Sequence, residues 1–369
     1  MDNWTRKKKN TVPIWYLSVR QERGIKAFDV QNYKTIEKGS FSLELNKDKS
    51  NERTFCPHSK LRYFSPQPES MPFDLNHGYP HKYLPMGSNV KDGVDHVLRW
   101  MLKEKYTLDQ GDASTVFLTS RGRLTKIFTS PYQMRGEGWK MAVTLYRKTF
   151  YIDEVRDSED SNSWMVYWGY KFEQYVCADQ PNGKPNIEGH INTSEAFYTV
   201  VESNINSFKL LFSGEVDCME ECPKYPTAPG YYVEMKTSLK PNGEDFFYRH
   251  KMLKWWAQSF LVGLSRIFAG YRNTSGIVHK TEMFEVQSIP ELCQKNIQNS
   301  WEPQVCMNFL CEFLSFVQKV VTQDNPSVVY LFTFDPSQRT ISVSIQEDAE
   351  HSIIPSWYIE ANQTETVSV

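Results

Sequence analysis

Two short stretches of the sequence place acidic side chains inside apolar, strand-like runs. The first, FKLLFSGEVDCM at residues 208–219, carries Glu215 and Asp217, and the second, GYYVEMKTS at residues 230–238, carries Glu234 and Lys236. Side chains two positions apart on a strand point to the same face of the sheet, so the members of each pair project together. If the two strands are neighbours, three carboxylates and one amine converge.

Converging carboxylates of this kind indicate metal-dependent chemistry. Like charges crowded in a partly buried sheet are costly unless a cation neutralises them, and hard oxygen ligands suit Mg²⁺ or Mn²⁺. Two such ions activate a water and stabilise the leaving oxygen during attack on phosphorus, while a lysine offsets charge on the phosphate. The spacing also matches the D-(D/E)xK nuclease core, so it predicts hydrolysis of a phosphodiester or phosphoanhydride. The alternative interpretation is a sheet face kept in water by its acids.

A predicted helix before the acidic strands adds a further carboxylate. Residues 162–176, NSWMVYWGYKFEQYV, repeat aromatic side chains at helical spacing, and Glu173 lies beside that stripe. The stripe that we expect to be buried consists of Trp164, Trp168, Phe172 and Tyr175.

A second predicted helix, residues 244–268, follows the acidic strands and has two different sides. Lys251, Lys254 and Gln258 share one side, and they form a local basic wall of the kind that holds a single nucleic-acid strand. Trp255 borders this wall, and we expect it to pack in the core. The side that we expect to be buried consists of Leu253, Trp256, Phe260 and Leu264.

The remaining pattern predicts one α/β domain of mixed, largely antiparallel twisted sheets flanked by helices. We expect helices at residues 94–105 and 305–321, a strand and a turn at 114–128, and hairpins at 141–155 and 328–345. No internal repeat or long linker interrupts the chain, so residues 1–369 are predicted to form a single catalytic domain. The ends, about residues 1–12 and 356–369, are predicted to be flexible.

Composition excludes several classes of protein. The chain has 369 residues, of which 40% are hydrophobic, and a formal net charge of −2, so duplex nucleic acid is not bound through a general excess of positive charge. No run of 18 apolar residues predicts a membrane span, and we expect no secretion signal, because no apolar core follows the charged residues at positions 1–10. The seven cysteines form neither a disulfide framework nor a zinc-ligand pattern, so we expect no structural disulfides.

Six stretches, in order along the chain, resemble the DXO family of RNA 5′-end decapping and quality-control enzymes. They are FDLNHGYPHKY, SRGRLTKIFTSPY, WGYKFEQYVCAD, SGEVDC, YVEMKTS and KWWAQSFLVG, and together they span about residues 73 to 263. Six motifs in the family's order are far more specific than any one of them.

The resemblance implies roles for individual residues. Two divalent ions, Mg²⁺ or Mn²⁺, would be held by the side chains of Glu173, Glu215, Asp217 and Glu234 and by the carbonyl oxygen of Met235. Lys236 and Gln258 would contact the scissile phosphate, and Arg121 would bind the 5′ end of the RNA. An exposed turn is the alternative interpretation of Arg121 and Arg123, a solvated helix position that of Glu173, and a helix-surface amide that of Gln258.

The resemblance also implies an activity and a setting. The expected substrates are RNAs with a 5′-triphosphate, an incomplete cap or an NAD cap, with 5′-to-3′ exoribonuclease activity in some family members. A nuclear 5′-to-3′ exoribonuclease is the implied partner and the nucleus the implied location, with RKKK at residues 6–9 as a candidate import signal. Two other functions stay open: a DNA-directed nuclease with the same core, and a non-catalytic module that stabilises an exoribonuclease.

Overall fold

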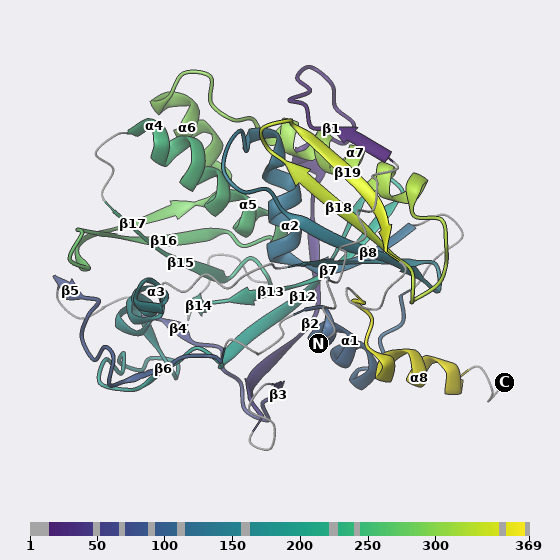
Figure 1. The fold of residues 1–369 in the computed structure, drawn as a ribbon. Coiled ribbons are helices and arrows are strands. Elements are labelled where there is room, and N and C mark those ends of the chain that lie inside the picture. Colours follow the sequence, from purple (N-terminus) through teal and green to yellow (C-terminus); the bar gives the residue numbers. More distant parts are fainter. Residues whose placement is uncertain are drawn as a thin grey trace, which may run out of the picture.

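Two large mixed sheets and one small one organise the chain (Figure 1). The computed structural model describes residues 15–46, 52–65, 71–87, 93–108, 115–155, 163–220, 228–239, 244–346 and 352–365. The larger sheet contains, in spatial order, β1 (Trp15–Ser18), β19 (Thr340–Gln346), β18 (Val329–Asp335), β8 (Lys140–Tyr146), β9 (Thr149–Glu154), β7 (Thr115–Ser120), β13 (Phe208–Val216), β12 (Ala196–Ile205), β2 (Thr35–Leu45) and β3 (Arg53–Phe55).

The second sheet lies beside the larger one and shares the acidic segment with it. It contains, in spatial order, β10 (Cys177–Ala178), β4 (Tyr63–Phe64), β14 (Cys218–Glu220), β15 (Tyr232–Leu239), β16 (Arg266–Arg272), β17 (Ile277–Glu285) and β5 (Phe73–Asp74). A two-stranded sheet pairs β11 (Ile191–Asn192) with β6 (Tyr83–Leu84). Most neighbours run antiparallel, but five pairs run parallel: β7 and β13, β7 and β9, β4 and β14, β15 and β16, and β6 and β11. The predicted mixed, largely antiparallel arrangement is therefore confirmed.

Helices flank both sheets. They are α1 (Asp95–Lys103), α2 (Arg121–Thr129), α3 (Ser163–Val176), α4 (Glu244–Phe246), α5 (Met252–Val262), α6 (Ile289–Asn296), α7 (Pro303–Val320) and α8 (Ser356–Glu365). A π-helical turn, Phe247–Lys251, leads into α5, and short 3₁₀ turns lie at Val30–Asn32, Ser130–Tyr132 and Val286–Ser288. No helix in the described ranges is long and apolar enough to cross a lipid bilayer.

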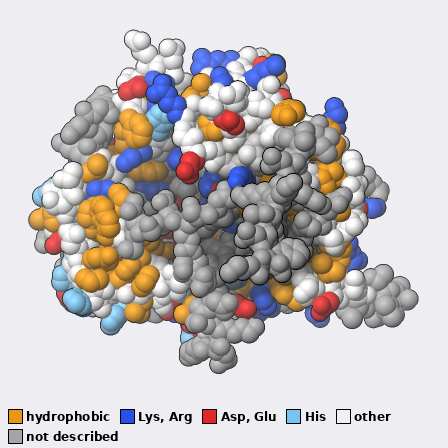
Figure 2. All heavy atoms as spheres, in the orientation of Figure 1, with side chains coloured by type: hydrophobic (Ala, Val, Ile, Leu, Met, Phe, Trp, Pro, Cys, Tyr) orange, Lys and Arg blue, Asp and Glu red, His pale blue; other side chains and the backbone are white. Residues whose placement is uncertain are grey.

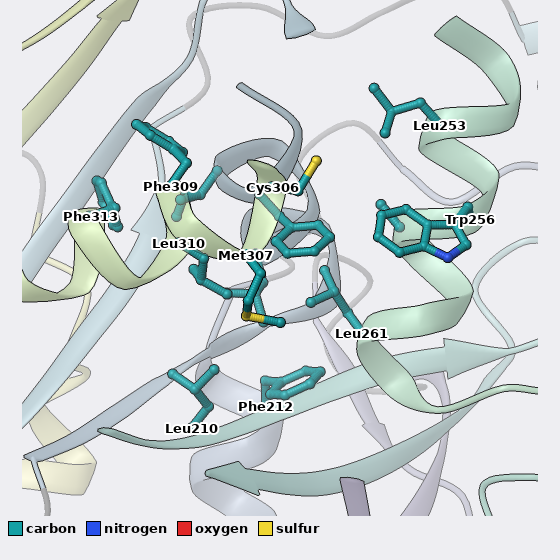
Figure 3. Close-up of a cluster of buried hydrophobic side chains, with 14 of the residues drawn as sticks. Leu210, Phe212, Leu253, Trp256, Leu261, Cys306, Met307, Phe309, Leu310 and Phe313 are labelled. Carbon is teal, nitrogen blue, oxygen red and sulfur yellow. The ribbon is translucent and has the colours of Figure 1, made fainter. Parts of the chain in front are cut away.

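The central strand β13 is buried on both of its faces. Leu210 and Phe212 point into a cluster that includes side chains of α5 and α7 (Figure 3). Leu211, between them, joins a different cluster with residues of α1 and with Tyr358 of α8. This alternation follows from the period of two along a strand. Because β13 is fixed from both sides, the acidic residues at its end have a rigid support.

Several predicted elements are confirmed. The hairpin of β8 and β9 turns at Arg147 and Lys148, which both have positive φ (49° and 60°), as a two-residue hairpin turn requires. The helix predicted at residues 305–321 is α7, and the hairpin predicted at 328–345 is that of β18 and β19. Trp255, 7% exposed, lies in the core as expected.

The segment after β7 corrects one prediction. The sequence predicts a turn there, whereas Arg121–Thr129 forms the helix α2. Leu124, Ile127 and Phe128 are buried at helical spacing, which favours the helix once they pack against α5 and α7. Gly122 has low helix propensity, and its place in the first turn conceals this period in the sequence.

The long helix predicted at residues 244–268 is also shorter and less regular than expected. It begins as α4, passes through the π-helical turn and ends at Val262, because Gly263 adopts a left-handed conformation (φ 86°). Phe260 is only partly buried, and Leu264 lies beyond the helix end although it is buried.

Two smaller expectations also differ from the structure. Trp164, predicted to lie in the buried stripe of α3, is 42% exposed, whereas the other three members of the stripe are buried. Residues 356–365, which the sequence predicts to be flexible, form α8, and Tyr358 packs against Tyr151. Residues 1–12 and 366–369, the other parts predicted to be flexible, lie outside the described residues.

Candidate active site

The two acidic stretches meet where the chain passes from the larger sheet into the second sheet. Glu215 lies near the end of β13, and Asp217 is the single residue between β13 and β14. β14 pairs antiparallel with β15, with Cys218 opposite Val233, and this register brings Asp217 beside Glu234. The backbone N–H of Met235 donates to Asp217 Oδ2 at 2.6 Å. The predicted pairing of the two acidic segments is therefore found in the structure.

Glu234 is the buried centre of this group. Its side chain is 1% exposed, with Arg121 Nη1 at 2.6 Å from one carboxylate oxygen and Lys236 Nζ at 2.6 Å from the other. Burial alone would raise the pKa of Glu234, but the two cations outweigh it and lower the pKa to about 2. Glu234 is therefore an ionised carboxylate held between an arginine and a lysine.

Arg121 reaches Glu234 because α2 begins directly after β7. β7 runs parallel to β13 with Ser120 opposite Ser213, so Arg121 lies next to the GEVD segment. Gly214 leaves room for it, since a Cβ at this position would lie 3.3 Å from Arg121 Cδ and 3.0 Å from Val262 Cγ2. Arg123, by contrast, lies 2.8 Å from Asp153 and away from this centre.

Glu173 approaches the same region from α3 and contacts Arg62, the residue before β4. Arg62 Nη2 donates to Glu173 Oε2. Burial raises the pKa of Glu173, and the guanidinium of Arg62 opposes that rise. The sequence interpretation does not include Arg62, and no spacing signal marks it, because its partner lies 111 residues away along the chain.

The electrostatics of the remaining acids fits a site for a cation. Burial raises the pKa of Asp217 well above its usual value, and the nearby carboxylates of Glu234 and Glu173 raise it further. The Glu215 carboxylate, together with burial, raises the pKa of Tyr170 on α3. Negative charges that disfavour one another in this way are the donor set that a hard divalent cation relieves.

Basic side chains pair with these acids in the structure. Within the described ranges, no three His, Cys, Asp or Glu side chains lie close enough together to hold one ion. Arg62 contacts Glu173, whereas Arg121 and Lys236 contact Glu234. Joint coordination of an ion by these acids therefore requires a rearrangement of side chains, although the oxygen donors themselves suit Mg²⁺ or Mn²⁺.

A polar pocket of about 400 Å³ adjoins the acidic centre. Glu215 and Asp217 line one side of it, and Arg62, Tyr170 and Gln174 line another. The structure thus gives the two acids of the GEVD segment a common access to solvent.

Gln258 and Lys251 lie on elements around the centre. Gln258 lies one helical turn before Val262 on α5, so the two side chains share one face of the helix. Val262 on this face lies close to Gly214 of the GEVD segment. Lys251 Nζ donates to Ser238 Oγ at 2.8 Å, and Ser238 lies two residues beyond Lys236 on β15. Lys251 of the predicted basic wall therefore borders the same strand as Glu234, while Lys254 is exposed on α5.

The pair of Arg62 and Glu173 leads to a prediction about stability. The side chains are 27% and 13% exposed, so Arg62→Gln leaves a largely buried carboxylate without its cation, and we expect the free energy of unfolding to fall by about 2 kcal/mol. Urea denaturation measures this loss. Lys295→Gln, which breaks the exposed pair with Glu291, is the control and should cost no more than about 0.5 kcal/mol. Equal losses of stability in the two variants would show that the pair of Arg62 and Glu173 stabilises the fold no more than an exposed ion pair does.

Comparisons with known proteins agree with this arrangement. The family model described as RAI1 like PD-(D/E)XK nuclease matches residues 35–359. The Decapping and exoribonuclease protein of Rattus norvegicus is 41% identical over 342 residues, which cover 88% of this chain and 84% of the relative. Decapping nuclease RAI1 of Aspergillus fumigatus is 32% identical over 290 residues, which cover 72% and 78% of the two chains. The crystal structure of S. pombe Rai1 matches with a TM-score of 0.69 and 27% identity, over 87% of this chain and 98% of that one.

The family match spans every strand of the two large sheets except β1, and every acidic residue of the centre. It also spans all six stretches from which the sequence predicted the relationship. This chain therefore belongs to the RAI1-like PD-(D/E)XK nuclease family, in agreement with its resemblance to the DXO enzymes.

Proposed function

We propose that this protein is a metal-dependent hydrolase that acts on the 5′ ends of RNA. The observation that carries the proposal is the contact between Asp217 and the Met235 N–H, because it unites the GEVD and VEMK segments around the buried Glu234. The relatives named as decapping nucleases support the same reaction class. A single catalytic domain formed by residues 1–369 is part of the proposal.

The proposed metal ligands are the side chains of Glu173, Glu215, Asp217 and Glu234 and the carbonyl oxygen of Met235. Hard oxygen donors of this type suit two Mg²⁺ or Mn²⁺ ions, which supply an activated water and stabilise the leaving oxygen when bound. Glu234 is already ionised, and the cations around it hold its carboxylate in place.

Basic and amide side chains have the proposed task of orienting the RNA. Lys236 and Gln258 address the scissile phosphate, and Arg121 binds the 5′ group beyond it. Lys236 lies on the same face of β15 as Glu234, so its amine stands beside the reacting centre while it contacts the carboxylate. When the Lys236 amine moves from Glu234 to a substrate phosphate, the Glu234 carboxylate becomes free to bind a metal ion.

The proposed substrates are RNAs with a 5′-triphosphate, an incomplete cap or an NAD cap. Hydrolysis adds water oxygen to the phosphorus that follows the first transcribed nucleotide or the NAD unit, and it breaks that phosphorus–oxygen bond. The 5′ group then leaves whole, with a free hydroxyl, and the RNA keeps a 5′-monophosphate. With a 5′-triphosphate, water instead attacks the α-phosphorus, the bond from this phosphorus to the oxygen that bridges to the β-phosphate breaks, and pyrophosphate leaves.

Product identity tests this proposal. We expect intact NAD from NAD-capped RNA and an intact cap dinucleotide from unmethylated capped RNA, with chromatography of the labelled small molecule as the measurement. Matched RNAs with a methylated cap or a 5′-monophosphate serve as comparison substrates. Nicotinamide mononucleotide as the first product would place the scissile bond inside the cap and contradict the proposal.

Two further parts of the proposal concern the setting of the enzyme. A nuclear 5′-to-3′ exoribonuclease is the proposed partner, and the nucleus, with the cytoplasm in addition, is the proposed location. The basic run at residues 6–9 that motivates nuclear import lies outside the described residues. Co-purification with the exoribonuclease and imaging of the tagged full-length chain test these two points.

A further inference from the structure

Arg272, the last residue of β16, is a buried cation with no acidic partner among the described residues. It is 9% exposed, its Nε has no hydrogen-bond partner, and its Nη1 donates only to the carbonyl oxygen of Asn273 at 3.2 Å. Its guanidinium lies 4.6 Å from the ring centre of Trp168, which compensates part of the cost of burying the charge. A buried charge without a counter-charge is costly, and burial lowers the pKa of Arg272.

A second cation lies at the same end of the sheet. In the pairing of β15 with β16, Ser238 stands opposite Tyr271, and Leu239 stands opposite Arg272. Lys251 donates to Ser238, and its pKa is lowered by burial and by the charge of Arg272. No described carboxylate forms an ion pair with either cation. Two positive groups without an acid partner therefore lie at this end of the sheet, Lys251 on the face of Ser238 and Arg272 on the other face beside Trp168. A phosphate at the end of the strands is an anion that both can approach and that the protein itself does not provide.

This end of β15 leads outward from the acidic centre. Glu234, Lys236 and Ser238 alternate along one face of the strand, so Lys251 is bound to the same face as the catalytic candidates. The strand runs from Glu234, 1% exposed, to Leu239, 41% exposed. At about 3.3 Å per residue, Ser238 lies about 13 Å beyond Glu234. Lys and Arg side chains are visible at several places on the face of the molecule that Figure 2 shows.

An exposed aromatic side chain continues this path. Trp164 is 42% exposed and meets Trp168 edge to face, with 4.5 Å between the ring centres. Trp168 is fixed by its Nε1–H bond to Asn76 and by Gly276, where a Cβ would lie 2.5 Å from the ring. A firmly held Trp168 thus supports an exposed ring of the kind on which unpaired bases stack.

We propose that Arg272 and Lys251 bind a backbone phosphate of the RNA chain on the 3′ side of the scissile phosphate, and that Trp164 stacks on a base of the same segment. This inference rests on the proposed function, since it assigns a binding site to the rest of the substrate. The 5′ group is compact and enters the buried centre, whereas the RNA chain must leave towards solvent, as β15 does.

Binding without turnover tests the inference. Fluorescence anisotropy of a 3′-labelled, 5′-monophosphorylated RNA, measured in chelator over a series of salt concentrations, gives the affinity and its salt dependence. For Arg272→Gln and Lys251→Gln, we expect the slope of log K against log salt to shrink by about 0.7 for each phosphate of the single strand that the variant no longer neutralises. A dinucleotide, which does not reach this site, should bind both variants as it binds the unmodified protein.

Matched variants separate this site from general charge and from folding. Lys280→Gln removes an exposed lysine of β17, 67% exposed and paired with Glu282, and should leave the slope unchanged. Arg272→Lys keeps the charge and should retain most of the slope. Because the free protein buries the charge of Arg272 without a partner, we expect Arg272→Met not to lower Tm, whereas removal of a purely structural arginine would lower it.

Three outcomes overturn the inference. Unchanged slopes in Arg272→Gln and Lys251→Gln would show that no phosphate binds there. Equal reductions in affinity for the dinucleotide and the longer RNA would place the bound phosphate at the 5′ end. Competition by inorganic phosphate without any dependence on RNA length would indicate a site for a free anion. If binding depends on RNA length but the protein does not cleave RNA, the binding site is supported and only the proposed function is contradicted.

Discussion

Asp217→Asn is expected to lower kcat by at least about a hundredfold, the loss seen when a group that stabilises the transition state is removed. The substitution removes one negative charge from the acidic centre and leaves the size of the side chain almost unchanged. Asn keeps an oxygen that accepts the Met235 N–H, so the contact between the two acidic segments has a substitute. We therefore expect Tm to change little while turnover falls, as measured with NAD-capped RNA.

Two further variants show whether the loss is specific to the charge at this position. Asp179→Asn makes the same change at an exposed acid that lines the same pocket, and its rate should stay near that of the unmodified protein. Glu234→Gln should lose turnover and stability together, because it leaves Arg121 and Lys236 without their carboxylate. Breaking a buried ion pair costs about 3–5 kcal/mol. Near-normal turnover in folded Asp217→Asn would mean that these strands are acidic without being catalytic.

Removal of divalent ions is expected to abolish turnover, and added Mg²⁺ or Mn²⁺ is expected to restore it. The acids around Asp217 disfavour one another's ionisation, so a bound cation stabilises the folded protein as well as the reaction. A ligand present at about a hundred times its Kd stabilises the native state by about 2.7 kcal/mol. A rise in Tm on titration with Mn²⁺ measures this effect without reference to activity.

The Asp217→Asn variant also serves as the control for ion binding. Its Tm should respond less to Mn²⁺, because one proposed ligand no longer carries a charge, whereas Asp179→Asn should respond as the unmodified protein does. Full turnover in chelator would rule out the metal assignment. An equal rise in Tm in all three proteins would place the ion elsewhere in the chain.

The sequence by itself determined which residues share a face and which elements carry them. A period of two places Glu215 with Asp217, and Glu234 with Lys236, whatever the rest of the chain does, because successive side chains of a strand alternate. The helical period of α3 likewise determined the burial of Phe172 and Tyr175. These properties depend on neighbours a few residues away, which is why sequence patterns reveal them. The order of six motifs was sufficient to predict the family.

Tertiary structure alone decided which charges became partners. Arg62 meets Glu173 across 111 residues and Arg121 meets Glu234 across 113, and no local period encodes such a contact. The start of α2 was equally hidden, since burial against α5 and α7 outweighs the low helix propensity of Gly122 in its first turn.

The same holds for Arg272, whose lack of a counter-charge depends on everything that surrounds the end of β16. The guanidinium of Arg272 lies against Trp168 of α3, and Lys251, bound to Ser238 of the neighbouring strand, adds a second positive charge at the same end of the sheet. Spacing in the sequence predicts which way side chains point on one strand or helix. Whether a charged side chain has a partner depends on every element that packs around it. For that reason the acids of this site and Lys236 were readable from the sequence, whereas the pairing of Arg62 with Glu173 and of Arg121 with Glu234 was found only in the folded chain.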